Sequence, residues 1–587
     1  MMALQRNSVL LGRKFNEYLF PTIISSMSIL LASFVDGIIV SALVNDNALS
    51  AVNLAEPVVL FMQAMFFLFG IGGAIGISIA KGQRDARKAN ALFTLSFLGA
   101  ALVSVIVTIV GTLLIDVITS AMCSDATLTE YVKHYAQVNI YGSLFMIVVP
   151  YLIFIIRVDG MPKFSANILL VSNIVNLLMD FVYMGLFKMD TAGAALATVT
   201  GYAVGFLMEL YYLFFFKKRT LRFIAVKKAE LSCLGELLTG GIASVVNTIL
   251  LFVKALLLNR IVLGATGADG MAVFSVCNFT VTFISMFVSG GSDTMTPIVS
   301  LLYGERDYKG IDIVLRKTFI FVGASCAVII AFILLFPNLL LSLFSVKSPE
   351  RVAIGVPVVR IFSLSLIGMG VCYITMNYLQ ATKQKTISLI TTFLRGLVIT
   401  VPLAYFLSYG FGLSGTSWAF VISEALTSMI TFLICFIVSR VKKDRYSGIL
   451  LHERQTDCSA LLDASLRPEA EQAAEISDRI IGFCAENGVT GKSAYYAGVL
   501  AEETVEHIRR FNSDKKQPQI DLICRITDES IILSVRDNGE AFDPATVHDD
   551  EDELTNLKMI NTFADEVSYT RALGLNNMLI TIGRTSC

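Results

Sequence analysis

Residues 54–85 read LAEPVVLFMQAMFFLFGIGGAIGISIAKGQRD, and this stretch decides the fold class. Its apolar part is longer than the roughly 20 residues that a helix needs to cross a hydrocarbon core of about 30 Å. Backbone polar groups cannot stay unpaired in lipid, so an apolar run of this length predicts a transmembrane helix. The run ends in a short basic loop, which is typical of the inner side of a membrane.

Similar apolar runs recur on both sides of this one, from Tyr18 to Ser439. The short alternating strands of a membrane barrel are absent from the sequence. The first run is too long for a signal peptide and lacks a small-residue cleavage site. We therefore predict an all-α polytopic membrane protein with twelve transmembrane helices, over residues 18–43, 54–80, 92–121, 135–157, 164–187, 192–216, 237–263, 271–302, 317–345, 357–380, 386–409 and 414–439.

The composition of the 587-residue chain agrees with this interpretation. Hydrophobic residues make up 55%, charged residues only 16%, and the mean hydropathy is +0.69. Soluble proteins have about 25% charged residues, so an ordinary soluble enzyme is excluded, as is a disordered or fibrous chain. The net charge of −1 is the sum of two unlike parts, because residues 1–446 carry +11 and residues 447–587 carry −12.

Lysine and arginine are distributed unevenly between the predicted loops. With the N-terminus inside, 25 of them fall in inside loops and five in outside loops. This bias predicts that both termini and the acidic tail are cytoplasmic, in the plasma (inner) membrane of a bacterium. The basic run 217–228 fits a loop beside anionic lipid, so no nucleic-acid partner is expected. The ten cysteines lack metal-site spacing and mostly lie in apolar runs, so we predict buried thiols and no metal site.

The membrane part repeats itself at an offset of 222 residues. Ser78–Asp85 aligns with Ser300–Asp307, Asp159–Lys163 with Ala381–Lys385, and Gly193 with Gly415. Six helices is an even number, so the two bundles have the same orientation in the membrane, an architecture of secondary transporters with a cavity between lobes. We predict an N-lobe (1–216), a cytoplasmic linker (217–236) and a C-lobe (237–440).

Residues 10–440 resemble the multidrug and toxic compound extrusion (MATE) family, through Ser33–Gly37, Gly72–Gln83 and Gly193–Thr198. The resemblance implies an antiporter that exports amphipathic organic compounds in exchange for Na⁺ or H⁺. One alternative is a lipid-linked or polysaccharide flippase of the same superfamily, which should have a strongly cationic cavity. Another is a membrane sensor with a serine-kinase signalling tail.

Four polar residues at membrane depth are candidates for the coupling site. Asp36 lies in the first predicted helix, Asn176 and Asp180 lie one turn apart in the fifth, and Thr198 lies in the sixth. Their oxygens could cage Na⁺, or the two carboxylates could share a proton. The family resemblance places the N-lobe cation site on the same four positions. The competing interpretation is that Asp180 caps a helix or faces water.

The C-lobe lacks this set, because at the repeat offset Asn176 falls on Val398 and Asp180 on Pro402. Coupling should therefore be asymmetric. Some family members carry an acid in helix 7 or 8, whereas this chain has a lysine in helix 7, which could favour anionic substrates. Glu209 is expected to reach the membrane interface. The remaining cavity candidates are Lys254, Asp293, Arg395 and Glu424.

After a linker (441–464), residues 465–587 have a soluble composition and predict helices on one face of an antiparallel or mixed sheet. The segments Glu502–Phe511 and Val535–Pro544 resemble the Bergerat-type ATP-binding fold of histidine kinases, gyrase, Hsp90 and MutL, in its anti-sigma-factor serine kinase branch. Gly488–Ser493 is rejected as a Walker A motif, because its glycines are too close together.

The resemblance implies that Asp537 receives adenine, Gly539 lets the base approach and Glu503 is the general base. His507 stands where the family has the asparagine that binds Mg²⁺. Asn556 stands where the family has the first glycine of its phosphate-side motif. A neutral histidine is a poor ligand for Mg²⁺. We therefore expect ATP sensing with weak or no kinase activity, and whether the chain is an enzyme stays open. The alternative is a degenerate domain that only contacts a soluble partner protein. Attraction between the acidic tail and the basic loops is a candidate regulatory contact.

Overall fold

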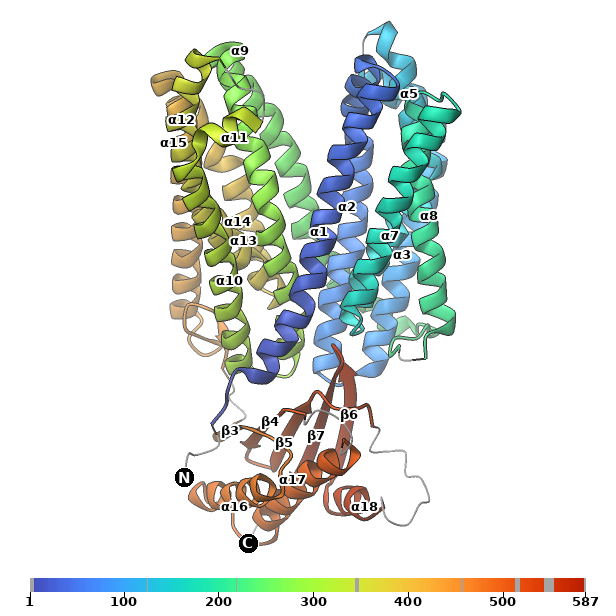
Figure 1. Ribbon diagram of the computed structural model, residues 1–587. Coiled ribbons are helices and arrows are strands. Elements are labelled where there is room, and N and C mark those ends of the chain that lie inside the picture. Colours follow the sequence, from blue (N-terminus) through green and yellow to red (C-terminus); the bar gives the residue numbers. More distant parts are fainter. Residues whose placement is uncertain are drawn as a thin grey trace.

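The computed structural model describes residues 5–123, 125–217, 219–343, 348–454, 458–512, 518–542 and 554–584. Its helices form two bundles that meet near the tail and spread apart at the opposite end (Figure 1). The N-lobe contains α1 (Val9–Leu43), α2 (Asp46–Gly82), α3 (Ala86–Leu113), α4 (Ile115–Met122), α5 (Ala126–Tyr141), α6 (Ser143–Val158), α7 (Pro162–Asp180), the π-helical η1 (Phe181–Leu186) and α8 (Thr191–Phe215).

The C-lobe begins with the short 3₁₀ helix η2 (Lys228–Leu231). The helices that follow are α9 (Ser232–Gly304), α10 (Tyr308–Leu335), α11 (Pro337–Leu343), α12 (Pro349–Ser363), α13 (Ser365–Ala381), α14 (Lys385–Phe393), the π-helical η3 (Leu394–Val398) and α15 (Thr400–Val441). Two of these are interrupted by glycines with positive φ, Gly267 in α9 (66°) and Gly412 in α15 (61°). Glycine accepts this backbone readily, so each break joins two shorter helices.

Within the described residues, ten helices are long and apolar enough to cross a membrane, or eleven if the bent pair Leu128–Tyr141 and Ser143–Val158 is one span. The sequence predicts twelve spans. The difference lies partly in the last segment, because 385–441 counts as one helix although the break at Gly412 separates the predicted spans 386–409 and 414–439. The protein is therefore a multi-pass membrane protein.

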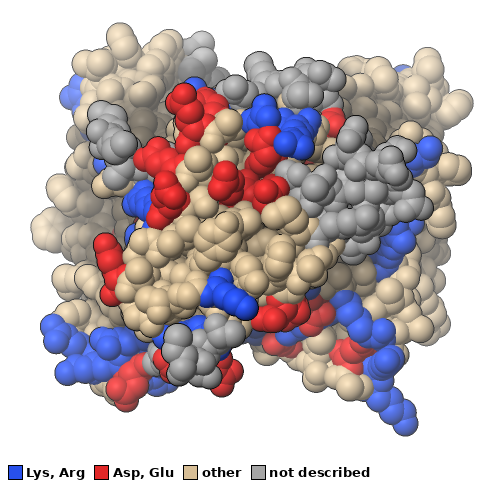
Figure 2. All heavy atoms as spheres, turned by 90° about the horizontal axis from the view of Figure 1, so that it is seen from below, with Lys and Arg blue, Asp and Glu red and all other residues tan. Residues whose placement is uncertain are grey.

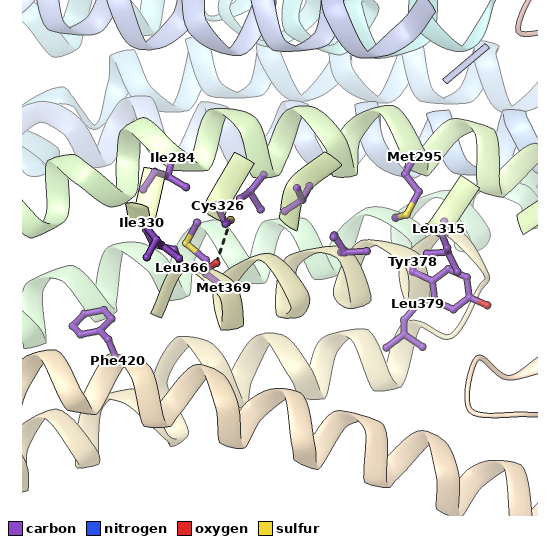
Figure 3. Close-up of a cluster of buried hydrophobic side chains, with 14 of the residues drawn as sticks. Ile284, Met295, Leu315, Cys326, Ile330, Leu366, Met369, Tyr378, Leu379 and Phe420 are labelled. Carbon is purple, nitrogen blue, oxygen red and sulfur yellow. Dashed lines mark hydrogen bonds between the residues drawn. The ribbon is translucent and has the colours of Figure 1, made fainter. Parts of the chain in front are cut away.

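Both lobes have cores of aliphatic and aromatic side chains. In the C-lobe, Leu366 and Met369 of α13 lie near Ile284 of α9 and Ile330 of α10, and Tyr378 of α13 lies near Leu315 of α10 (Figure 3). The nine cysteines in the described part of the chain are free, and eight of them are buried. This confirms the prediction of buried thiols for those eight, whereas Cys458 is partly exposed and Cys587 lies outside the described residues.

The tail is a five-stranded antiparallel sheet with the order β3-β4-β5-β7-β6. Its strands and helices are β3 (Ala460–Leu466), α16 (Ala470–Glu486), α17 (Lys492–Phe511), β4 (Ile520–Ile526), β5 (Ser530–Asp537), α18 (Leu554–Phe563), β6 (Glu566–Ala572) and β7 (Leu575–Gly583). The helices cover the sheet face that points away from the membrane part (Figure 1). The other face is turned toward the lobes.

The segment predicted as a linker contains structure. Strand β3 pairs with β4 from Ala460↔Ile526 to Leu466↔Ile520, and a small hairpin of β1 (Tyr446–Ser447) and β2 (His452–Glu453) precedes it. Asp463 and Ser465 alternate with apolar residues and bond groups of the N-terminal segment and β4. A strand whose second face is polar looks like a solvated linker in the sequence, which is why β3 was missed.

Candidate functional site

A cavity of about 250 Å³ lies inside the N-lobe, lined by residues of α1, α2, α5, α6, α7 and α8. Three of the predicted residues line it: Asp36, Asn176 and Thr198. With its amide oriented to satisfy both neighbours, Asn176 donates to the two carboxylate oxygens of Asp36 at 3.2 Å. Its oxygen accepts from Thr198 Oγ1 at 3.2 Å, so this amide links α1 to α8.

The fourth predicted residue, Asp180, ends α7 and is fully buried beside Asp36. Neither of its carboxylate oxygens has a hydrogen-bond donor among the described residues. It therefore neither faces water nor caps a helix. The π-helical turn η1 follows at once, and such turns are frequent at functional sites. Two adjacent carboxylates at membrane depth require a shared proton or a cation.

The C-lobe holds a different set of charges. Arg395 Nε donates to both carboxylate oxygens of Glu424 at 3.0 Å, and the pair is buried. Lys254 is also buried and lies over the ring of Phe420, 5.2 Å from its centroid. At the repeat offset, Lys254, Arg395 and Glu424 fall on Ala32, Asn173 and Tyr202, which all line the N-lobe cavity. Both lobes thus carry a polar cluster at equivalent positions of the repeat. The charged side chains are acidic in the N-lobe cluster, whereas the C-lobe cluster contains two bases and one acid.

The fourth cavity candidate, Asp293 on α9, is close enough to Arg157 of α6 for the two charges to interact, and so lies between the lobes. Glu209 corrects a prediction: it is 0% exposed, and its carboxylate has no hydrogen-bond partner in the described part of the chain. It does not reach the membrane interface. Glu56, which the sequence interpretation passed over, lines the N-lobe cavity with Asn53. For both Glu209 and Glu56, the sequence signal of a functional position was a charged residue inside an apolar run.

The tail places Asp537 at the end of β5, 1% exposed. Its Oδ1 accepts from Gly539 N at 2.7 Å and from Asn576 Nδ2 at 3.0 Å, and burial raises its pKa to about 6. A Cβ on Gly539 would lie 2.7–2.8 Å from side-chain atoms of Asn512 and Asp537, so a larger residue there would displace one of them. The adenine-binding role of Asp537 and Gly539 stays a prediction.

The phosphate end differs. His507 is buried between the rings of Phe511 and Phe542, with centroid distances of 5.8 and 4.8 Å. Burial lowers the pKa of His507 to about 4, so it is neutral at pH 7, and aromatic rings rather than oxygen ligands surround it. Glu503 is half-buried on α17, and burial raises its pKa. Asn556 belongs to α18, but its side chain and the segment 543–553 lie outside the described residues. No group of three metal-binding side chains occurs in the residues searched.

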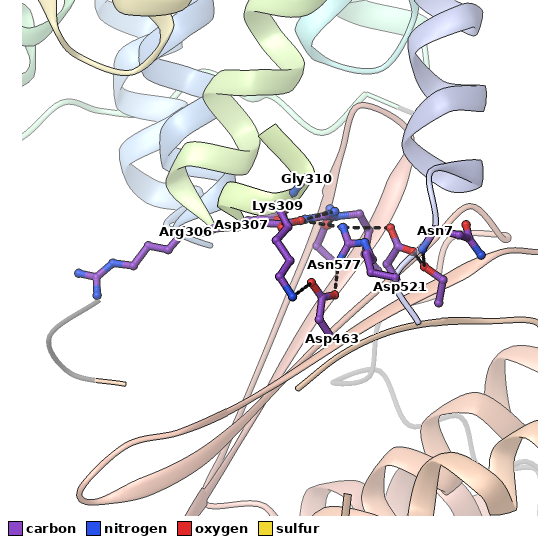
Figure 4. Close-up of polar contacts among 12 residues, drawn as sticks. Asn7, Arg306, Asp307, Lys309, Gly310, Asp463, Asp521 and Asn577 are labelled. Carbon is purple, nitrogen blue, oxygen red and sulfur yellow. Dashed lines mark hydrogen bonds and ion pairs between the residues drawn. The ribbon is translucent and has the colours of Figure 1, made fainter. Parts of the chain in front are cut away.

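The tail is joined to the membrane part by buried ion pairs (Figure 4). Arg6, before α1, bonds Asp307 at 2.8 Å, Asp463 at 2.9 Å and Asp521 at 3.2 Å. Arg536 of β5 bonds Asp307 at 3.1 Å and also contacts Glu305. Arg6 follows the expected attraction, because it is a basic residue of the membrane part that binds acids of the tail. Arg536 shows the opposite arrangement, because here the tail supplies the base and the membrane part supplies the acids.

The charge distribution is visible from the tail side (Figure 2). Acidic side chains gather on the tail, and many Lys and Arg side chains lie toward the rim. The turn between β6 and β7 reaches up to the lobes: Leu573 is buried in the core cluster of the C-lobe, and Gly574 lies against Gly160 of the N-lobe. The tail therefore touches both lobes.

Comparison with known proteins agrees with this architecture. The family model described as MatE matches residues 21–182 and 243–406, one match in each lobe. The multidrug export protein MepA of Staphylococcus haemolyticus (strain JCSC1435) is 24% identical over 435 residues, covering 74% of this chain and 95% of the relative. MepA of Staphylococcus aureus (strain MRSA252) is 23% identical over 425 residues, with coverage of 72% and 93%.

Solved structures share the fold. The outward-facing conformation of a multidrug resistance MATE family transporter of the MOP superfamily matches with a TM-score of 0.69 at 23% identity, covering 73% of this chain and 96% of that one. A MOP superfamily transporter from Pyrococcus furiosus Vc1 (DSM3638), whose binding pocket of reverse polarity suggests a different function, matches with a TM-score of 0.67 at 22% identity and coverage of 73% and 96%. Since the two matches to the family model span more than half of the chain, the protein belongs to the MatE family.

Proposed function

We propose that the protein is a secondary active antiporter that exports amphipathic organic compounds in exchange for Na⁺ or H⁺. The observation that carries this is Asp180, a buried carboxylate beside Asp36 with no donor in the described residues. A proton or Na⁺ bound there neutralises the pair, and its release toward the other side of the membrane restores the repulsion. The lobes spread at one end and meet at the other, as expected for one state of alternating access.

The names of the curated relatives support an organic substrate, since both MepA proteins are multidrug export proteins. The flippase alternative called for a strongly cationic cavity. The C-lobe does not favour the flippase alternative. Glu424 neutralises Arg395, so Lys254 is the remaining positive charge of that cluster. We place the tail, with both termini, on the cytoplasmic side, as the loop charges predict.

The test is dye export from reconstituted vesicles with an imposed Na⁺ or H⁺ gradient. Wild-type protein should move a cationic dye only with the gradient, and Asp36→Asn should abolish the dependence. Asp116→Asn is the matched control, because Asp116 is exposed and pairs only with Lys133 among the described residues, at 2.6 Å. Equal gradient-driven export by wild type and Asp36→Asn would contradict the coupling site.

For the tail we propose a nucleotide-sensing regulatory domain with weak or no kinase activity. The tight Asp537–Gly539 turn supports adenine binding, and the aromatic surroundings of His507 argue against a magnesium site there. When bound, the nucleotide would supply phosphate charge at the end of α17. Calorimetric titration of the full chain with ATP and ADP, with and without Mg²⁺, tests this. Asp537→Asn should lose binding and exposed Asp528→Asn should keep it; silence in every titration leaves a domain that only contacts a partner protein.

A further inference from the structure

A second cavity, of about 360 Å³, lies where the N-lobe, the C-lobe and the tail meet. Three arginines line it: Arg84 after α2, Arg306 after α9 and Arg525 on β4. The first two are related by the repeat, since they are 222 residues apart in the shared G-x-R-D sequence. Both have the left-handed backbone, with φ of 61° and 57°. The repeat thus delivers one arginine from each lobe to the surface on which the tail docks.

This backbone conformation is uncommon and strained for a residue other than glycine. The turn is fixed from both sides. Before it, Gly82 and Gly304 pack against the backbone of the opposite lobe, where a Cβ would clash. After it, Asp85 caps α3 by accepting from Lys88 N, and Asp307 caps α10 by accepting from Gly310 N, both at 2.8 Å. The arginines are therefore held in place by the lobe contact itself.

Two of the arginines that line the cavity have an unpaired side-chain nitrogen within the described part of the chain. The Nε atoms of Arg84 and Arg525 are buried, and neither has a hydrogen-bond acceptor among the described residues. Arg525 uses Nη2 on the carbonyls of Glu305 and Arg306, at 3.0 and 3.4 Å. Burial lowers the pKa of both side chains, and the charge of Arg525 lowers that of Arg84 further, to about 10. Buried cations in this position are unfavourable unless an anion joins them.

Among the described residues, Glu305 is the acidic side chain that lines the cavity. Arg536 on the neighbouring strand binds Oε2 of Glu305, and Oε1 of Glu305 has no hydrogen-bond partner in the described part of the chain. The rest of the wall is neutral and is made by Gly82, Gln83, Gly304, Cys458, Thr527, Ile532 and Leu579. In the described lining, three arginines thus outnumber one glutamate.

We propose that this cavity binds a phosphate group, carried either by a small phosphorylated metabolite or by the headgroup of an anionic lipid. The planar guanidinium fork matches two phosphate oxygens, so Arg84 and Arg525 each donate to the ligand. Arg84 belongs to the N-lobe and Arg525 to the tail, and a shared phosphate holds the two together. Occupancy thus stabilises the docked tail and the lobe contact above it. The site lies on the sheet face opposite the helices that carry Glu503 and His507.

The experiment uses the full chain in nanodiscs of phosphatidylcholine. Inorganic pyrophosphate, which lacks a base, is titrated at constant ionic strength while thermal unfolding is followed. Wild type should show saturable stabilisation, and Arg84→Asn and Arg525→Gln should bind at least tenfold more weakly. Asparagine is chosen at position 84 because it tolerates the left-handed backbone. Arg87→Gln is the control and should bind as wild type, since Arg87 is exposed and pairs with Glu230 at 2.5 Å.

A second arm replaces phosphatidylcholine by phosphatidylglycerol and omits pyrophosphate. Stabilisation that disappears in the same two variants identifies the lipid headgroup as the source. Asp537→Asn must keep pyrophosphate binding, which separates this site from the proposed nucleotide site. The proposal is overturned if neither probe stabilises the protein, if both arginine variants bind as wild type, or if only Asp537→Asn loses binding.

Discussion

The two lobes use one helical plan for different purposes. In the N-lobe, Asp36 lines a cavity and accepts from Asn176, whereas the neighbouring Asp180 has no donor among the described residues. In the C-lobe, the neighbouring positions hold Arg395 and Glu424, which satisfy each other. The repeat therefore preserves the location of the polar cluster but not its chemistry. An unsatisfied cluster can exchange ions, whereas a satisfied one holds helices together.

The same contrast occurs at the tail. Gly82 and Gly304 are equivalent in the lobe contact, and Asp85 and Asp307 are equivalent as helix caps. Only Asp307 also receives Arg6 and Arg536. Equivalent backbone thus carries unequal side-chain contacts, since the loop at Asp307 forms an ion pair with the tail residue Arg536 and the loop at Asp85 has none among the described residues.

Removing the acid of the C-lobe pair should have the largest effect. Glu424→Gln leaves Arg395 buried without a full counter-charge, which costs about 3–5 kcal/mol of stability. Thermal unfolding in detergent measures this, and the double variant Glu424→Leu/Arg395→Leu should recover most of the loss. If Glu424→Gln instead unfolds like wild type and only export fails, then the C-lobe charges are functional and the contrast between the lobes is broken.

A paired substitution at the caps should have the next largest effect. Asparagine also caps helices, so Asp85→Asn and Asp307→Asn both keep their helix N-terminus. Only Asp307→Asn weakens the charge opposite Arg6 and Arg536, and we expect tail docking to lose about 2 kcal/mol. Protease protection of the tail reads this out, with Asp85→Asn as the matched control. Equal protection in both variants would remove the C-lobe's special role.

The glycine pair should show that the lobes are equal where they touch. In Gly82→Ala the new Cβ meets the backbone oxygen of Leu301, and in Gly304→Ala it meets that of Ile79. Such overpacking costs about 1–3 kcal/mol, so each variant should open the contact to a similar extent. Spin-label distances across the contact measure the opening. A large difference between the two variants would show that the lobes are also unequal at the contact between them.

The smallest effect expected is a pH dependence of tail docking through Asp521. Burial raises its pKa to about 6; Arg6 and Ser465 oppose the shift, and Asp307 and Asp463 add to it. Because the pKa of Asp521 is raised in the docked tail, its protonated form stabilises docking. This stabilisation is complete below the ordinary aspartate pKa of about 3.9 and is lost as pH rises through about 6. Docking should therefore weaken severalfold between pH 5 and 7. Asp521→Asn should flatten that change in the same protease assay; an unchanged slope assigns the effect to another group.

Much of the architecture could be predicted from residue patterns. Long apolar runs located the spanning helices, and the 222-residue offset located equivalent loops, because both depend on local sequence. Strand β3 was missed because its polar face docks onto other residues, and Glu209 was misplaced because its burial depends on neighbouring helices. Asp36, Asn176 and Thr198 line one cavity, but their role in coupling stays a prediction, as do the roles of Glu503, His507 and Asn556.

The contact between Arg6 and Asp463 has a consequence for biogenesis. It joins residues 457 positions apart, so it can form only after both lobes have been synthesised and the tail has left the ribosome. Until then Arg6, Glu305 and Asp307 remain without the tail groups that bury them. Docking of the tail thus reports that the helices before it have assembled, and a chain that stalls during membrane insertion keeps this polar surface open to proteases.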